Sequence, residues 1–206
     1  MAKAKTYPVS VEGDLSVPPA RGWWLIKWLL ALPHYFVLAC LTVAFVCVCI
    51  VAFFAILFTG KYPRGLFDFN AGVLRWSWRV GFYSYQALGT DKYPPFSLDP
   101  SKDYPADLEI KYPRKLSRGL VLVKWWLLAI PHYAVVAAFQ GGAGSNGGVG
   151  LNWALVLIAG FVLLFTGKYH KDIFKLVVGI NRWYYRVSAY AALMTDEYPP
   201  FRLWDD

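Results

Sequence analysis

Four motifs occur in the same order in both halves of this chain of 206 residues. The pairs are KWLLALPHY at 27–35 and KWWLLAIPHY at 124–133, FTGKY at 58–62 and 165–169, RWSWR at 75–79 and RWYYR at 182–186, and YPPF at 93–96 and 198–201. Because the four motifs return in the same order, the sequence indicates two copies of one unit. Any fold for this sequence has to accommodate two similar halves.

Charged residues are absent from two long apolar windows, one in each copy. Residues 28–60 and 125–167 contain no Lys, Arg, Asp or Glu, and only 17% of the whole chain is charged. Soluble domains carry about 25% charged residues, so this pattern favours a membrane protein. A membrane-spanning helix needs about 20 apolar residues. Each window is therefore long enough for two short spans.

A glycine-rich insert interrupts the second window. Residues 140–152 read QGGAGSNGGVGLN. Backbone groups without partners are excluded from hydrocarbon, so the insert predicts a helical hairpin in the second copy. By similarity of the copies, we expect a turn near residues 40–45 in the first. A long interfacial helix followed by one span is the alternative for the first window.

The predicted fold class is an all-α membrane protein of two tandem pseudo-symmetric repeats with short cytoplasmic β-strands. A segment with arginines at helical spacing follows each hairpin, as is typical of an amphipathic interfacial helix, and alternating apolar residues near 7–15 and 104–112 predict strands. The predicted boundaries are repeat 1 at 7–100, with spans 22–41 and 44–59 and an interfacial helix 65–89, and repeat 2 at 104–206, with spans 119–139 and 153–167 and an interfacial helix 170–194.

The basic residues predict the topology. Every Lys and Arg lies outside the two uncharged windows 28–60 and 125–167, and basic residues concentrate in the cytoplasmic segments of membrane proteins. We therefore expect a multi-pass plasma-membrane protein with both termini in the cytoplasm. The net charge of +8 then favours anionic lipid as a partner over nucleic acid.

Two arginine pairs, spaced i, i+4 on the predicted interfacial helices, are the first candidates for a binding site: Arg75 with Arg79, and Arg182 with Arg186. Arginine binds phosphate through planar, bidentate donors, so each pair could hold a lipid phosphate. Two other interpretations stay open. The side chains could reach the headgroups without selecting a lipid, or they could pair with a carboxylate such as Asp91 or Asp196.

Lys61 and Lys168 of the two FTGKY motifs are further candidates for contact with anionic headgroups. The motif is not a phosphate-binding P-loop, which requires GxxxxGK[ST], because tyrosine follows the lysine. Gly60 and Gly167 instead predict a helix end, with the glycine in the left-handed conformation and the lysine beside the negative end of the helix dipole.

His34 and His132 occupy the same place in the two PHY motifs and could ligate haem or a metal between the copies. No cluster of carboxylates or thiolates accompanies them in the sequence, so packing is the favoured explanation. Pro33 and Pro131 beside them predict helix kinks. The motifs of serine hydrolases and zinc proteases are missing, and we expect no catalytic residue, no metal site and no cofactor.

The run from KWLLALPHY to FAILFTGKYPRGLFDFNAGVLRWSWRVGFYSYQALGTDKYPPF resembles the bacterial membrane-protein family called domain of unknown function 4389. The resemblance covers about residues 20–97. The second copy keeps KWWLLAIPHY, LLFTGKY, NRWYYRV and TDEYPPF, but it has the glycine insert and reads KYHKD in place of KYPRG. The resemblance implies a membrane protein of a kind common in actinobacteria and implies no particular activity.

These features favour a non-enzymatic accessory or scaffold subunit of a larger plasma-membrane complex, which binds anionic headgroups through the arginine-bearing helices. The expected partners are membrane lipids and other membrane-protein subunits. Two alternatives remain. One is a component for transport or permeation of a small molecule or lipid, and the other is a haem- or quinone-associated redox accessory subunit that uses the two histidines.

Overall fold

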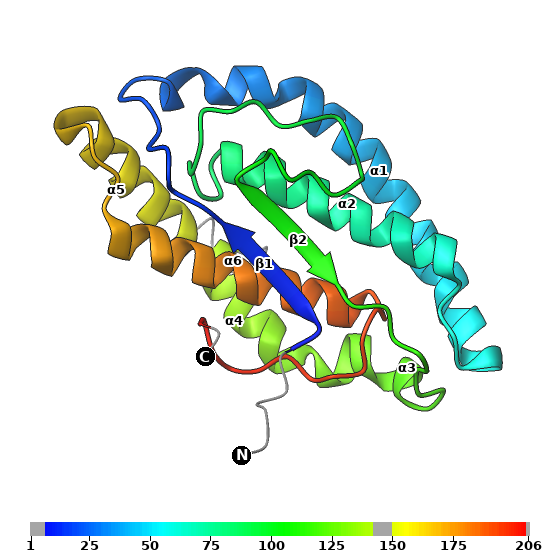
Figure 1. Ribbon diagram of the computed structural model, residues 1–206. Helices are drawn as coiled ribbons and strands as arrows, with labels where there is room; N and C mark the ends of the chain where they lie inside the picture. The colour runs from blue at the N-terminus through cyan, green and yellow to red at the C-terminus, as the bar shows by residue number, and fades with distance from the viewer. Residues whose placement is uncertain (1–6, 142–149, 205–206) are drawn as a thin grey trace, which may run out of the picture.

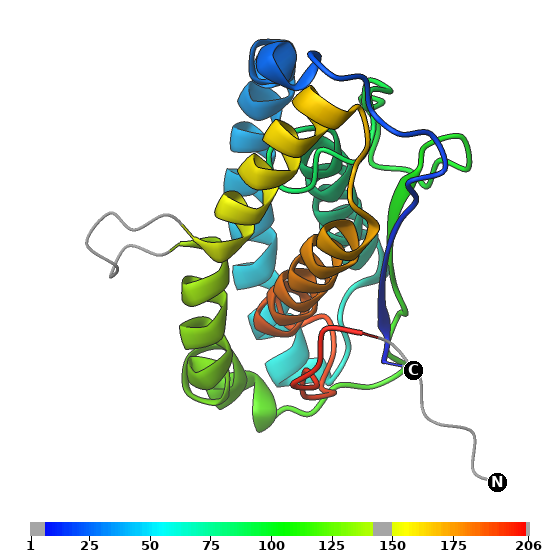
Figure 2. The same cartoon turned by 90° about the vertical axis from the view of Figure 1, so that its left-hand side faces the viewer.

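The computed structural model describes residues 7–141 and 150–204, and they form three layers (Figures 1 and 2). A sheet of two strands, β1 (Val9–Gly13) and β2 (Ala106–Ile110), is the first layer. Helices α2 (Arg64–Tyr83) and α6 (Lys171–Ala191) are the middle layer. The remaining helices form an outer layer on the side of α2 and α6 that faces away from the sheet.

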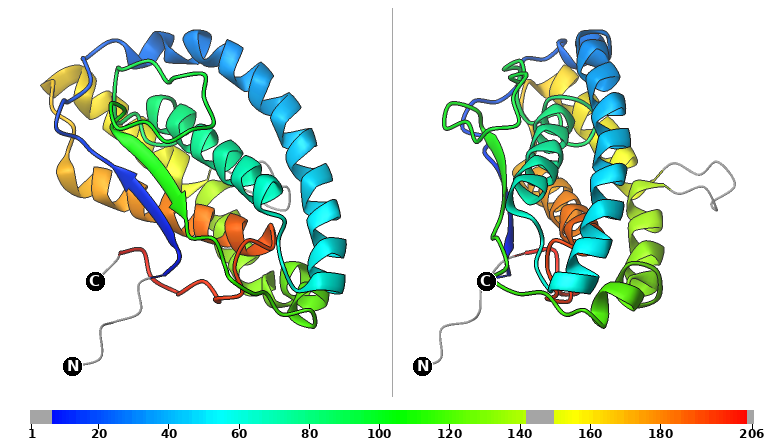
Figure 3. Two further views of the ribbon diagram at one scale, coloured as in Figure 1. Left: turned by 45° about the vertical axis from the view of Figure 1, so that its right-hand side comes forward. Right: turned by 90° about the vertical axis from the view of Figure 1, so that its right-hand side faces the viewer.

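The first apolar window forms a single helix of the outer layer. Helix α1 runs without a break over Trp24–Thr59, so the predicted turn near residues 40–45 is wrong, and the expected spans 22–41 and 44–59 are one element. No glycine or proline interrupts the sequence between Pro33 and Gly60, so nothing stops the helix there. At a rise of 1.5 Å per residue α1 is about 54 Å long, and it follows the whole length of the molecule (Figure 3).

The second apolar window forms the other half of the outer layer. Its elements are α3 (Leu120–Val123), a π-helical turn η1 (Lys124–Leu128), α4 (Ile130–Gln140) and α5 (Leu151–Thr166). They follow one another in one general direction, opposite to that of α1 (Figures 1 and 2). The predicted hairpin is therefore wrong.

The adjoining ends of α4 and α5 lie against each other. A Cβ atom added to Gly150 would lie 2.2 Å from the carbonyl carbon of Gln140. Most of the predicted glycine loop, residues 142–149, lies outside the described residues. The glycine insert thus separates two helices that continue in the same general direction. In the first copy, the corresponding window forms the single continuous helix α1.

The π-helical turn η1 coincides with a difference in length between the copies. The second copy has one residue more between Lys124 and Pro131 than the first has between Lys27 and Pro33. A π turn absorbs one extra residue while the helix continues. Just beyond it the chain bends by 41°, next to Pro131, where proline predicted a kink. Helix α1 continues through Pro33.

The predicted pair of strands is confirmed, and the strands are exchanged between the copies. β1 and β2 are antiparallel, with Val11 opposite Leu108, and their alternate apolar residues are buried. Helix α2 of the first copy packs on β2 of the second, and α6 packs on β1. Each copy therefore covers the helix of the other.

Helices occur at the positions of both predicted interfacial helices, but α2 and α6 lie between two other layers. Their tryptophan-rich flanks meet the outer helices and the sheet rather than a membrane interface. Within residues 7–141 and 150–204, α1 alone is long and apolar enough to cross a membrane, and α3–η1 with α4 adds a second candidate if that bent pair counts as one span. The four-span topology lacks support. The repeat boundaries 7–100 and 104–206 stay predictions.

Candidate functional site

The arginine pairs lie between the middle helices and the sheet, where Arg75, Arg79 and Arg186 are buried and Arg182 is half-buried. Arg79 and Arg186 expose 0% and 1% of their surface. Arg79 donates from Nη1 to the carbonyl oxygen of Asp99 at 2.8 Å and from Nη2 to Oδ1 of Asp107 at 3.1 Å. Asp107 also pairs with Arg75 at 3.3 Å. These contacts use the donors that a lipid phosphate would require. They also fit the alternative in which the arginines pair with a carboxylate, although the carboxylate is that of Asp107 and not that of Asp91.

Arg75 and Arg182 bind the outer edges of the sheet. Arg75 donates from Nε to the carbonyl oxygen of Leu108 at 2.9 Å, and Arg182 donates from Nη2 to that of Val11 at 3.2 Å. Unpaired edge carbonyls invite pairing with another chain, and each arginine occupies one of them. Burial lowers the pKa of Arg75, and the Asp107 carboxylate opposes this shift. The arginine stripes thus hold the sheet to the helices.

Gly60 and Gly167 end the outer helices as predicted. Their φ angles are 71° and 70°, and their N–H groups donate to Ile56 and Leu163 at 2.8 Å. The left-handed conformation at the residue after a helix suits glycine, which has no Cβ to clash. Lys61 and Lys168 follow directly and are exposed, so they project from the two ends of the outer layer.

Two arginines that the sequence interpretation missed lie at the same ends. A Cβ on Gly167 would lie 2.5 Å from Nε of Arg21, and a Cβ on Gly60 would lie 3.6 Å from Nε of Arg118. Each arginine therefore lies beside the negative end of a helix from the other copy. The available signal was the dipeptide Arg-Gly before both apolar windows. We call Arg21, Lys61, Arg118 and Lys168 the basic ends.

His34 and His132 lie in separate aromatic clusters. Nδ1 of His34 accepts a hydrogen bond from Nε1 of Trp76 at 3.1 Å, and the ring stacks on Phe96 with centroids 3.9 Å apart. Nδ1 of His132 accepts from Trp183 at the same distance, and its ring stacks on a phenylalanine of the second YPPF motif. An Nδ1 that accepts leaves the proton of a neutral imidazole on Nε2. The two rings do not form a shared ligand site.

Two buried lysines also went unrecognised in the sequence. Lys27 donates to the carbonyl oxygen of Thr90 at 2.7 Å and pairs with Asp91 at 2.8 Å. Lys124 makes the same contacts with Thr195, at 3.0 Å, and with Asp196, at 2.7 Å. These bonds join each outer helix to the loop that carries YPPF. The carboxylates predicted as arginine partners therefore bind lysine, and the recurring Thr-Asp before YPPF was the signal.

A network of amide side chains fills the interior where α4 and α5 meet. Asn181 donates to Asn152 at 3.2 Å and to the carbonyl oxygen of Gln86 at 3.0 Å. Gln140 donates to Asn181 at 3.3 Å. Buried polar groups are costly without partners, and these residues satisfy one another beside the break between the two helices. The uncharged amides did not stand out in the sequence.

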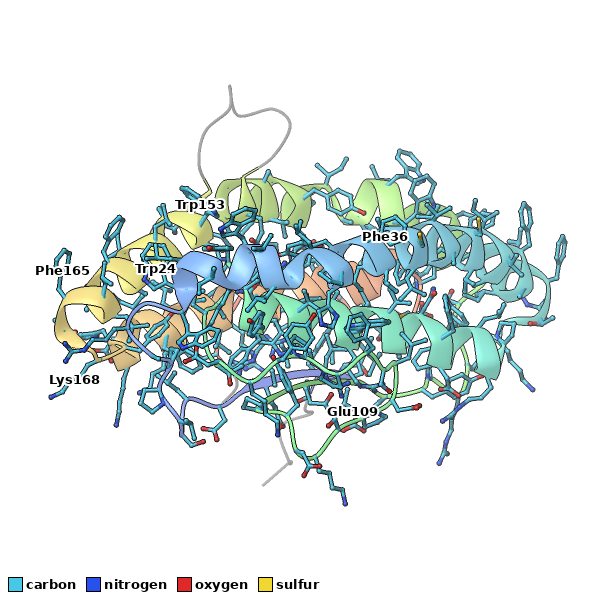
Figure 4. The ribbon with its side chains drawn as sticks, turned by 90° about the horizontal axis from the view of Figure 1, so that it is seen from above. Trp24, Phe36, Glu109, Trp153, Phe165 and Lys168 are labelled. Atoms are coloured by element: carbon cyan, nitrogen blue, oxygen red, sulfur yellow. The ribbon has the colours of Figure 1, made fainter. Side chains whose placement is uncertain are left out.

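Large apolar side chains are exposed over the outer layer. Phe36, Phe58 and Phe165 expose 74%, 72% and 78% of their surface. Figure 4 shows Phe36 and Trp153 on the side of the outer helices and Glu109 on the opposite, sheet side. Further exposed members of this apolar face are Leu25, Ile26, Trp28, Leu29, Leu32, Val43, Val46, Ile50, Val51, Phe54, Leu122, Trp125, Trp126, Leu127, Ile130, Ile158 and Phe161. Soluble monomers rarely expose contiguous apolar patches larger than a few hundred Å².

The sheet presents the opposite chemistry. Its outward residues are polar, because Ser10 lies opposite Glu109 and Glu12 lies opposite Asp107. The molecule therefore has an apolar face on one side, an acidic face on the other and the basic ends at the margins of the apolar layer. In Figure 4, Lys168 lies at the end of α5, below Phe165 and toward the sheet side.

A family model described as "Domain of unknown function (DUF4389)" matches residues 22–97 and 148–202. The first segment runs from the start of α1 to the first YPPF motif, and the second runs from just before α5 to the second YPPF motif. No curated protein and no solved structure matches the chain.

Proposed function

The chain belongs to the DUF4389 family of unknown function, and we propose that it is a non-enzymatic scaffold that lies in the plane of an anionic membrane surface. The observation that carries the proposal is the apolar face of α1 and α3–α5, opposite an acidic sheet and bordered by basic ends. Helices that lie in a membrane interface bury an apolar side by about 5–10 Å and attract anionic lipid with basic residues.

The layering favours an in-plane orientation of α1 over a spanning one. The sheet runs alongside the outer layer (Figure 2), so a spanning α1 would draw Glu12, Asp107 and Glu109 into the hydrocarbon as well. A charged side chain at the centre of a bilayer costs at least about 2.5–3.5 kcal/mol. In the plane, the carboxylates stay in water, and α1 can exceed the 30 Å or so of hydrocarbon without mismatch.

The basic ends supply the contact with headgroups in this proposal. Lys61 and Lys168 keep the role expected from the sequence, and Arg21 and Arg118 join them in place of the buried arginine pairs. Each basic residue near an anionic surface contributes about 1 kcal/mol. The acidic sheet then faces the cytoplasm, where other subunits of a membrane complex can reach it.

Vesicle flotation of the full chain tests this proposal. The variant R21Q/K61Q/R118Q/K168Q should bind vesicles of phosphatidylcholine and phosphatidylglycerol up to several hundredfold more weakly than the unaltered chain, because four contributions of about 1 kcal/mol are lost and about 1.4 kcal/mol is a factor of ten. Its binding to pure phosphatidylcholine should be unchanged.

The matched control is K92Q/K102Q/K111Q, which removes exposed lysines from the sheet side and should keep full binding. The control removes three charges and the test variant four, so an equal loss of binding free energy per charge removed would show that net charge alone governs binding and would refute the orientation.

A further inference from the structure

The two halves of the outer layer meet near both ends. At one end Trp24 of α1 packs on Gly160 of α5, where a Cβ would lie 3.3 Å from the indole, and its ring lies 5.7 Å from that of Phe161. At the other end Gly60 accepts a hydrogen bond from the N–H of Leu116 at 2.9 Å. Between these closures, two adjoining hollows open along α1.

The hollows form one groove with apolar walls. The first, of about 360 Å³, lies between α1, α2 and α6, and the second, of about 390 Å³, lies between α1, Trp125 of η1 and the end of α6. Both are lined by Cys49 and Ala191, so they adjoin at these two residues. Each lies within the range of about 300–1,000 Å³ that is usual for ligand pockets.

The lining suits hydrocarbon. The second hollow is walled by Val46, Ile50, Phe54 and other largely apolar side chains, and the polar atoms of its side chains belong to the Cys49 thiol and the Trp125 indole. The lining of the first also includes the hydroxyl-bearing residues Thr42, Ser77, Tyr184 and Ser188. The Thr42 and Ser188 hydroxyls already donate to the carbonyl oxygens of Leu38 at 2.7 Å and Tyr184 at 2.9 Å. A charged ligand would find no counter-charge in these walls.

The groove opens onto the apolar face and runs toward one basic end. Val46, Ile50 and Phe54 line it and are themselves about half exposed on that face. The part of α1 from Leu38 to Phe54 measures about 24 Å at 1.5 Å per residue, which exceeds the roughly 15 Å of hydrocarbon in one leaflet. Lys61 lies seven residues beyond Phe54, just after the end of α1, with Arg118 beside the same helix end.

We propose that this groove holds one hydrocarbon chain of an anionic phospholipid, with the headgroup at Lys61 and Arg118. The proposal rests on the in-plane membrane binding proposed above, since the bilayer supplies the lipid. The bound chain lies along α1, in the plane of the membrane, and no longer along the bilayer normal. The protein thereby tilts a lipid out of its leaflet.

Photo-cross-linking tests this proposal with phosphatidylglycerol that carries a diazirine near the end of one acyl chain. After irradiation in vesicles, the cross-links should map to the groove, on Val46–Phe54 and Ala191–Leu193. Ala191→Phe should lower the yield in the groove by about tenfold, a change of about 1.4 kcal/mol. Ala134→Phe adds the same ring at an exposed position of α4 outside the groove and should leave the yield unchanged.

Flotation of the same samples separates the two proposals. A chain that fails to float refutes the in-plane membrane protein. A chain that floats but is labelled equally at Phe36, Trp153 and the groove, with no effect of Ala191→Phe, refutes the lipid groove alone. If Ala191→Phe fails to fold, Val46→Trp at the exposed rim decides in its place. A neutral isoprenoid recovered with the purified chain in place of phospholipid would also overturn the proposal.

Discussion

A guanidinium group that is wholly buried has to find its partners within the protein. Arg79 does so by spanning two segments of the chain, since it bonds the backbone at Asp99 and the carboxylate of Asp107. Removing one partner of a buried charge pair is strongly destabilising, whereas exposed pairs contribute little. The residues of one helix that carry the same charge therefore differ widely in their contribution to stability.

Arg79→Met should lower the free energy of unfolding by about 3 kcal/mol, because the Asp99 carbonyl and the Asp107 carboxylate lose a buried donor. Arg64→Met on the same helix removes an exposed pair with Asp68 and should cost less than about 1 kcal/mol. Denaturant unfolding in one detergent measures both. Losses of equal size would contradict the structural role of Arg79.

Spacing along the chain predicted that Arg75 and Arg79 share a helix face, and both do bind the same segment through Asp107. Spacing could not predict that this face is covered, because the covering strand β2 comes from the other copy. The glycine helix ends were predictable, since their conformation is decided by neighbouring residues. The basic ends were only partly predictable, because the position of Arg21 beside Gly167 depends on contacts between the copies.

At the scale of the element, η1 preserves the same buried contacts in the second copy although that copy is one residue longer. Lys124 and His132 make the same bonds as Lys27 and His34, although one more residue separates them. Each added residue rotates an α-helix by about 100°, so an uncompensated insertion would turn one of the two side chains away from its partner. The wider π turn prevents this rotation.

Deleting Trp126 should convert η1 to an ordinary helical turn with little loss of stability, within about 1 kcal/mol, because the first copy already has that length and the π turn holds the surplus residue. Deleting Ala134 in the neighbouring helix α4 has no such surplus to remove. It should cost about 2 kcal/mol or more, since the buried contact of Gln140 with Asn181 is lost. Denaturant midpoints compare the two deletions, and equal costs would refute this account.

The direction of α5 shows where pattern alone fails. A glycine-rich segment in an apolar window is compatible with a second helix that runs antiparallel to the first, as in a hairpin. It is equally compatible with a second helix that continues in the direction of the first. Packing of Asn152 and Val156 against the middle layer selects the second, and no local signal encodes that packing. The helical character of both windows followed from their sequence, whereas the path of the chain did not.

At the scale of the whole molecule, the three layers divide the surface by chemistry. The outer layer is apolar, the sheet is acidic, and the middle helices contact solvent little. The low content of charged residues and the two uncharged windows predicted membrane association. They could not distinguish a helix that spans a membrane from one that lies in its plane. That difference depends on which layers of the protein pack against the helix.

Spin labels on α1 should show this difference. If α1 lies in the plane as proposed, labels that replace Phe36, Val43 and Ile50, three exposed positions at seven-residue spacing, should report nearly equal and shallow depths in vesicles. A spanning helix would separate the first and last label by about 21 Å in depth. A label at Glu109 on the sheet should remain accessible to aqueous relaxants, and a graded depth along α1 would refute the in-plane orientation.

The exchanged strands also decide the order in which the chain can fold during synthesis. The ribosome delivers α1 and α2 before Ile110 completes β2, and β1 waits for α6 near the end of the chain. Domains usually fold as units in the order of their synthesis, but here the first half has no cover of its own. Its apolar outer helix α1 is already synthesised while α2 still lacks the strand β2 that covers it. On the in-plane proposal, the membrane is then the first surface available to shelter the nascent chain, so insertion precedes completion of the fold.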